Sequence, residues 1–137
     1  MVKIGLIGLG YLGKIHLRLL REINSFEIVG IYDIDKSVCE ALSKQYNVKA
    51  FNSIEELIEA ADAIDIVTPS QSHFQIASAS IKKGKHVFVE KPITPTVDEA
   101  KQLLVLQKEA GTKFQVGHVE RFNPAFLSLK GQVLQPM

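Results

Sequence analysis

Residues 4–17, with the sequence IGLIGLGYLGKIHL, decide the fold of this chain. The apolar beginning of the stretch predicts a buried strand, because strands of parallel sheets are apolar on both faces. This strand runs into the pattern Gly8-x-Gly10-x-x-Gly13, after which apolar residues recur at helical spacing. A strand, a glycine turn and a helix in this order are typical of a unit that binds a dinucleotide.

The three glycines of the turn have separate predicted roles. Gly8 permits the tight turn, Gly10 lets the backbone approach a pyrophosphate, and Gly13 lets the helix lie close to the strand. The phosphates would lie at the N-terminus of the helix, beside Tyr11 and Leu12. Unpaired N–H groups and the positive end of the helix dipole point outward there, so the turn is a candidate cofactor-binding segment.

An acidic residue follows at the distance that a dinucleotide site requires. Residues 26–33, FEIVGIYD, predict a second strand that ends in Asp33, twenty residues after Gly13. A carboxylate in this place can accept a hydrogen bond from the 2′-hydroxyl of the adenosine ribose. Asp33 favours NAD over NADP, because it would repel a 2′-phosphate. Asp35 adds to this repulsion, and Lys36 is the one nearby cation.

Two alternative hypotheses for the glycine turn are a turn without a ligand and a flavin site. The glycines could serve an ordinary tight turn between a strand and a helix, with no ligand. Flavin binding is disfavoured, because Leu17 stands where flavin folds usually have Gly or Ala. The strand, turn, helix, second strand and terminal acid together favour a nicotinamide dinucleotide.

Composition and charge restrict the class of protein. The 137 residues fit one domain, and 46% hydrophobic with 23% charged residues is ordinary for a folded protein in water. A net charge of +1 gives no reason to expect nucleic acid or an anionic membrane as a partner.

Cys39 is the single cysteine and no Cys/His cluster has metal-ligand spacing, so we expect a cytoplasmic protein without a metal site. Glycines interrupt the apolar N-terminus, and no stretch reaches the roughly 20 apolar residues of a membrane span.

Strands and helices alternate along the chain. Predicted strands cover 2–7, 26–33, 48–51, 63–67, 86–89 and 113–117, and predicted helices after the first cover 35–46, 53–58, 72–83, 96–110 and 125–130. Asp35, Ser53 and Thr96 are candidate N-caps, while Gly84 and Gly111 are candidate helix stops. The alternation predicts an α/β, doubly wound parallel sheet of Rossmann type, with strand order 3-2-1-4-5-6.

The end of the chain does not fit this sheet. We expect residues 1–120 to form the Rossmann domain. Residues 121–137, with an extended run at 132–135, would begin a second domain that is otherwise missing from the chain. A dinucleotide domain needs such a partner to hold a substrate against the nicotinamide.

Polar residues cluster at the predicted carboxyl ends of the strands, where an open parallel sheet binds its ligand. Besides the glycine turn and Asp33, these candidate cofactor-binding residues are Thr68, Pro69, Ser70, His73, Glu90, Lys91 and His118. Each has a plainer alternative: a strand stop for residues 68–70, a surface histidine for His73, and loop or edge charges for Asp65 and Glu90. Their common edge favours one shared cleft.

Lys91 is the candidate catalytic residue. Oxidation of an alcohol by hydride transfer also requires removal of the hydroxyl proton. A lysine beside the cofactor can accept this proton when burial or the charge of the oxidised nicotinamide favours its neutral form. A protonated lysine can still hydrogen-bond the substrate oxygen, and Glu90 would orient it. The alternative for Lys91 is a solvated surface lysine.

Three segments together resemble the Gfo/Idh/MocA family of oxidoreductases. They are Gly8-Leu9-Gly10-Tyr11-Leu12-Gly13-x-x-His16, Glu90-Lys91-Pro92, and Val116-Gly117-His118-x-Glu120-Arg121-Phe122-Asn123-Pro124. The resemblance covers the whole chain and implies an NAD-dependent dehydrogenase that transfers hydride between a sugar, sugar-nucleotide or polyol hydroxyl and nicotinamide. It also implies that Lys91 lies by the nicotinamide and the substrate hydroxyl, and that Thr68, Ser70, His73 and Glu90 line the cofactor.

The resemblance has consequences for the whole protein. Family members usually add a C-terminal α/β domain, which supplies an Asp/His pair with a catalytic histidine and mediates oligomerisation. This chain alone is therefore expected to bind cofactor without being a competent catalyst, and its parent is expected to be a homo-oligomer. Residues 116–124 look most like members that act on UDP-N-acetylhexosamines or their uronic acids. The rival hypothesis is a non-catalytic dinucleotide sensor or interaction module, which has no chemical need for Lys91 or for residues 118–124.

Overall fold

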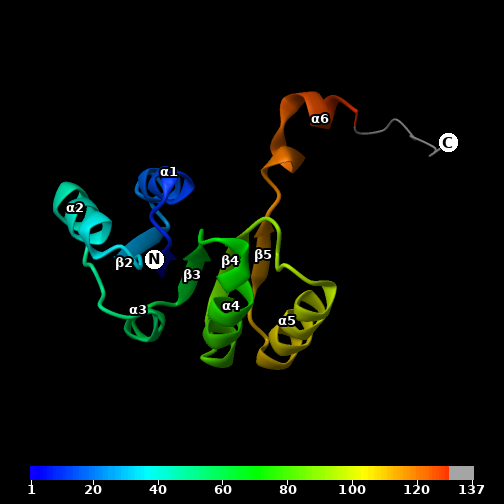
Figure 1. The fold of residues 1–137 in the computed structure, drawn as a ribbon. Helices are drawn as coiled ribbons and strands as arrows, with labels where there is room; N and C mark the ends of the chain where they lie inside the picture. The colour runs from blue at the N-terminus through cyan, green and yellow to red at the C-terminus, as the bar shows by residue number, and fades with distance from the viewer. Residues whose placement is uncertain (130–137) are drawn as a thin grey trace.

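The apolar N-terminal run forms the strand on which the sheet is built. In the computed structural model, which describes residues 1–129, β1 (Val2–Ile7) pairs in parallel with β2 (Phe26–Tyr32) on one side and β3 (Ala63–Ile66) on the other. The sheet continues through β4 (His86–Glu90) to β5 (Phe114–Gly117), with the order β2-β1-β3-β4-β5 (Figure 1). The reversal of strand order beside β1 confirms the predicted doubly wound sheet.

The predicted third strand is not formed as a strand. Residues 48–51 make one parallel bridge, between Ile31 and Ala50, at the outer side of β2. This is the side on which the predicted order placed them, but the sheet has five strands and not six. The Val48 N–H is used at the C-terminus of the preceding helix and the next helix begins at its N-cap Ser53, so backbone pairing with β2 is confined to Ile31.

Helices cover both faces of the sheet (Figure 1). Helices α1 (Tyr11–Leu20) and α2 (Lys36–Tyr46) lie on one face, and α3 (Ile54–Ala60), α4 (His73–Lys82) and α5 (Val97–Ala110) lie on the other. Side chains alternate across each strand, so adjacent residues of β1 contribute to two separate cores. One core is formed by Leu6, Leu9, Leu17, Ile31, Cys39 and Leu42, and the other is built around Ile7, Leu57, Ile64, Ile66, Ile81 and Val89.

Three helices begin at predicted N-caps, and α5 ends at the predicted Gly111, whereas the C-cap of α4 is Lys83, one residue before the predicted stop Gly84. The carboxylate of Asp35 accepts hydrogen bonds from the first turn of α2, and the hydroxyl of Ser53 does the same for α3. Thr96 and Glu99 form a reciprocal capping box at the start of α5. Gly111 ends α5 with a φ of 64°, a conformation that glycine adopts without steric cost.

Replacing Thr96 with alanine is expected to lower the free energy of unfolding by about 1 kcal/mol. The substitution removes the hydroxyl that accepts from the Glu99 N–H over 3.3 Å. Urea unfolding checks this value. Lys101→Ala, at an exposed position of the same helix, is the matched control and should change stability by less than about 0.5 kcal/mol. Equal losses in both variants would contradict the capping role.

The chain leaves the sheet after β5. A short turn of 3₁₀ helix, η2 (Val119–Phe122), leads to α6 (Pro124–Ser128), and both stand apart from the sheet in Figure 1. Helix α6 corresponds to the helix predicted at 125–130. The extended run predicted at 132–135 lies outside the described residues, as does the end of the predicted segment 121–137. Within residues 1–129, no helix combines the length and the apolar character needed to cross a membrane.

Candidate functional site

A cleft of about 720 Å³ opens at the carboxyl ends of the strands. Its size lies within the range of about 300–1,000 Å³ that is typical of ligand sites. It joins the glycine turn to the segments that follow β2, β3 and β4. The predicted site residues that line it are Gly8, Gly10, Tyr11, Leu12, Asp33, Thr68, Pro69, Glu90 and Lys91. Segments that are far apart in sequence thus share one cavity.

The glycine turn leaves open space in front of helix α1. Gly8 has a φ of 96°, and a Cβ there would lie 2.5 Å from the carbonyl oxygen of Val67. A Cβ at Gly13 would overlap the carbonyl oxygen of Gly8, so the helix approaches the turn as closely as it does because no side chain intervenes. Gly10 is the N-cap of α1, and nothing lies within 4 Å of a Cβ built on it. A ligand can therefore reach the free N–H groups of the helix.

The carboxylate of Asp33 ties the end of β2 to the glycine turn. The Leu9 N–H donates to Asp33 Oδ2 over 2.6 Å, and the Asp35 N–H donates to Asp33 Oδ1 over 2.8 Å. An ionised carboxylate has about four acceptor positions, so Asp33 can accept further hydrogen bonds from a ligand hydroxyl. The residue is thus held at the cleft in a fixed orientation.

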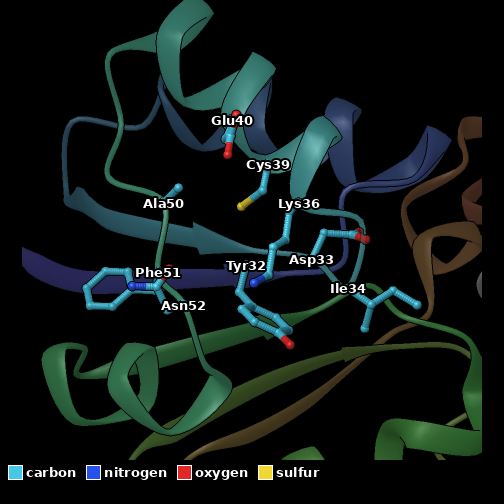
Figure 2. Close-up of a pocket in the computed structure, with 9 residues that line it drawn as sticks. All are labelled: Tyr32, Asp33, Ile34, Lys36, Cys39, Glu40, Ala50, Phe51 and Asn52. Atoms are coloured by element: carbon cyan, nitrogen blue, oxygen red, sulfur yellow. The ribbon is translucent and has the colours of Figure 1, made fainter.

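A second, smaller pocket lies behind Asp33 (Figure 2). It shares Tyr32, Asp33 and Ile34 with the cleft and is also lined by Lys36 and the thiol of Cys39. Figure 2 shows the carboxylate of Asp33 turned away from Cys39, while the amino group of Lys36 lies near Tyr32. Lys36 is therefore not paired with Asp33 in this arrangement.

His73 lies beneath the cleft and not on its surface. His73 is only 1% exposed, so the alternative of a surface histidine was wrong. The ring nitrogens lie 2.9 Å from the carbonyl oxygens of Pro92 and Thr68. His73 thus connects the segment after β3 to the segment after β4, and each of its ring nitrogens faces a backbone carbonyl oxygen.

Lys91 stands at the edge of the cleft, immediately after β4. It is exposed, and its backbone N–H donates to Glu90 Oε2 over 3.1 Å. The Lys91–Pro92 peptide bond is cis. Of the other predicted residues, Gly13, Ser70 and His118 do not line the cleft. His118 is exposed at the end of β5.

Three ionisable side chains form a cluster that the sequence did not reveal. His16 Nδ1 lies 2.9 Å from Asp65 Oδ2, and His16 Nε2 lies 3.4 Å from Glu90 Oε1. Burial lowers the pKa of His16, but the hydrogen bond and charge of Asp65, together with Glu90, outweigh burial and raise that pKa above 6.5. Burial raises the pKa of Asp65, and His16 opposes this rise. Asp65 is 3% exposed in a central strand, so it is neither a loop nor an edge charge.

Sequence reasoning also missed part of the lining of the cleft. Ile34, Ile54, Gln71 and Ser72 line it, although none was a candidate. Ser72 Oγ lies 2.8 Å from both Thr68 Oγ1 and the Pro69 carbonyl oxygen, so its hydroxyl ties this segment together. Only their place in the sequence could have identified two of them as candidates, because Gln71 and Ser72 directly follow the polar segment 68–70.

Comparisons with known proteins agree with this geometry. The model of an oxidoreductase family with the NAD-binding Rossmann fold, GFO_IDH_MocA, matches residues 2–118. UDP-N-acetylglucosamine 3-dehydrogenase from Acidithiobacillus ferrooxidans is 30% identical over 94% of this chain and 41% of that protein. Its crystal structure superposes with a TM-score of 0.89, over 94% of this chain and 42% of that one.

Two Bacillus subtilis enzymes show similar relationships. Glucose-6-phosphate 3-dehydrogenase is 33% identical over 93% of this chain and 35% of its own length. The NAD(+)-dependent scyllo-inositol 2-dehydrogenase is 31% identical over 96% of this chain and 40% of its own length. The chain therefore spans less than half the length of these relatives.

Proposed function

Because the chain belongs to the Gfo/Idh/MocA family of NAD-binding oxidoreductases, we propose that it is the nucleotide-binding part of a dehydrogenase. The reaction is hydride transfer between nicotinamide and a hydroxyl of a sugar, a sugar nucleotide or a polyol. The observation that carries the proposal is the single cleft that joins the glycine turn, Asp33 and Lys91. A non-catalytic sensor would need the first two of these features, but not a lysine at the far end of the cleft.

The residues of the cleft fit a dinucleotide. The space in front of Gly10 and the free N–H groups of α1 suit the pyrophosphate, and the remaining acceptor positions of Asp33 suit the adenosine ribose. Thr68, Pro69 and Glu90 would line the path between these two sites and Lys91. Bound NAD would supply the acceptor for the hydride.

Lys91 is the proposed acid or base. Lys91 lines the cleft directly after β4, and β3 separates β4 from β1 and β2, which carry the segments proposed to hold the pyrophosphate and the ribose. It would remove the proton from the substrate hydroxyl during oxidation and return it during reduction. The backbone of Lys91 is held by Glu90, so Glu90 would act by orienting it.

His73 would serve the site indirectly. Its ring holds the carbonyls of Thr68 and Pro92 at a fixed separation, which keeps the segments after β3 and β4 in place around the cofactor. Direct contacts of His73, Ser70 and His118 with the cofactor stay predictions.

Asp33→Ala is expected to weaken NADH binding about tenfold or more, and NADPH binding by less. A hydrogen bond to a charged group contributes about 1.5–3 kcal/mol, and about 1.4 kcal/mol corresponds to tenfold in affinity. Removal of the carboxylate also removes its repulsion of a 2′-phosphate. Calorimetric titration with both nucleotides checks the difference. Asp62→Ala, at the opposite end of the sheet, is the control, and a parallel loss for NADH and NADPH would refute the proposed role of Asp33.

The relatives support proposals about the substrate and partners of the whole protein. We propose that a further, substrate-holding domain joins this one in the whole protein, that the substrate is a sugar or a sugar nucleotide, and that the protein assembles from identical copies. The single cysteine, Cys39, is buried and free, which suits the cytoplasm as the proposed location.

The reaction is tested by incubating the whole protein with NAD and a panel of hydroxyl compounds. UDP-N-acetylglucosamine, glucose 6-phosphate and inositols form the panel, because enzymes named for these substrates are similar to this chain. Appearance of NADH with one of them supports the dehydrogenase. Tight NADH binding without turnover on any member of an extended sugar panel supports the sensor instead.

A further inference from the structure

His16 belongs to the glycine-turn motif, but the proposed function supplies no role for it. It lies on α1, six residues after Gly10, and its side chain is directed at the sheet and not at the cleft. The ring packs edge-on against Phe88 of β4, with 5.9 Å between the ring centroids and an angle of 61°. The site around His16 is thus formed by the face of the sheet that α1 covers.

The strand register brings acidic side chains onto this face. Asp65 is aligned with Phe88, and Glu90 lies two residues further along β4, so all three side chains point to the same side. Asp65 and Glu90 contact the two different nitrogens of the His16 ring. The side chains of His16, Asp65 and Glu90 are only 16%, 4% and 12% exposed, so solvent does little to screen their charges.

The protein leaves room for the Glu90 carboxylate on the side that faces β5. Glu90 is paired in register with Gly117 of β5, and a Cβ at Gly117 would lie 2.5 Å from Glu90 Oε1. Glycine at position 117 therefore leaves space for the Glu90 carboxylate between His16 and β5. The second oxygen, Oε2, accepts the backbone N–H of Lys91. One carboxylate thus connects His16 to the residue proposed to move the proton.

We propose that His16 is a positioning residue for Lys91: its ring bridges Asp65 and Glu90 and holds the Glu90 carboxylate against the backbone N–H of Lys91. This inference rests on the proposed function, because it assigns Lys91 the chemical step. His16 carries the proton of the cluster, since an imidazolium donates from both ring nitrogens and a neutral imidazole from only one. Asp65 on β3 and Glu90 on β4 are the charged groups that face the ring within the described residues.

The first test measures the bridge without any enzymatic activity. The titration of His16 is followed by NMR of the whole protein labelled at its histidine rings. Glu90→Gln and Gly117→Ala are both expected to lower the His16 midpoint toward 6.5, the first by removing the charge and the second by displacing the carboxylate. An unchanged midpoint in both variants would overturn the bridge, whether or not the protein proves to be a dehydrogenase.

The second test links the bridge to catalysis. His16→Gln is expected to lower kcat about 10- to 100-fold, because small displacements of a catalytic group are costly, while Kd for NADH stays within about twofold. Gly117→Ala should lower kcat similarly, and the double variant should lose no more than the worse single variant, because both changes act through Glu90. His86→Gln, at the exposed start of β4, is the control and should retain activity.

The outcomes separate the two proposals. Multiplicative losses in the double variant, or full kcat in a folded His16→Gln protein, would overturn the positioning role. Failure of the wild-type protein to bind NADH would instead overturn the proposed function, and the NMR result would still decide whether the bridge exists.

Because the pKa of folded His16 is raised, its stabilising contribution is complete below about pH 6.5 and is lost as the pH rises through the folded pKa. The stability difference between wild type and His16→Gln should therefore shrink at alkaline pH, and a constant difference would count against the bridge.

Discussion

Lys91→Ala is expected to lower kcat by about 10²–10⁴-fold, the range that general acid–base catalysis contributes. NADH affinity should change little, because the pyrophosphate and ribose sites lie at the glycine turn and Asp33. The lysine is exposed at the edge of the cleft, so its loss should not destabilise the fold. Steady-state kinetics and NADH titration of the whole protein measure the two effects separately.

Lys91→Arg distinguishes a proton carrier from a fixed positive charge. Arginine keeps the charge and the hydrogen-bond donors, but it does not release its proton in proteins. The activity of Lys91→Arg should therefore stay close to that of Lys91→Ala. Recovery of most activity would show that the charge alone matters, and equal losses of kcat and NADH affinity would point to a role in cofactor binding. Lys101→Ala, on the surface of α5, is the control.

The second large effect concerns the glycine turn, where two substitutions should have opposite consequences. Gly13→Ala forces a methyl group into the carbonyl oxygen of Gly8, and backbone atoms on both sides must move. We expect a loss of about 3 kcal/mol or more in the free energy of unfolding, at the upper end of overpacking effects. Thermal or urea unfolding measures this loss.

Gly10→Ala should leave the fold nearly unchanged and weaken NADH binding at least about tenfold. The space around a Cβ at this position is open, so alanine fits the ligand-free protein. The same space is where the pyrophosphate would approach the N-terminus of α1. Unchanged NADH affinity in a stable Gly10→Ala protein would show that the turn does not hold the phosphates. A large loss of stability would contradict the open geometry of the turn.

Local features of the fold could be predicted from sequence because they depend on neighbouring residues. Asp35, Ser53 and Thr96 cap helices through their own side chains, and these three helix starts were predicted correctly. The parallel sheet followed from the alternation of apolar runs and helices. The segment 48–51 failed as a strand because the Val48 N–H is used at the end of the preceding helix, which confines the pairing of the segment with β2 to Ile31.

Tertiary features of the site were less predictable. The sequence placed His73 near the correct strand end, but it could not indicate that the ring would turn inward onto two backbone carbonyls. The cluster of His16, Asp65 and Glu90 joins α1, β3 and β4, and only the register of the sheet brings these residues together. An acid within an apolar strand was the visible signal for Asp65. Its partner could not be identified without the fold.

Titration of the protein with NADH and then with NADPH tests the central claim most directly. The claim is that the cleft formed by the glycine turn, Asp33 and Lys91 holds a nicotinamide dinucleotide. We predict saturable NADH binding, detected by nicotinamide fluorescence or calorimetric heat, with weaker binding of NADPH. A folded protein that binds neither nucleotide would contradict the account.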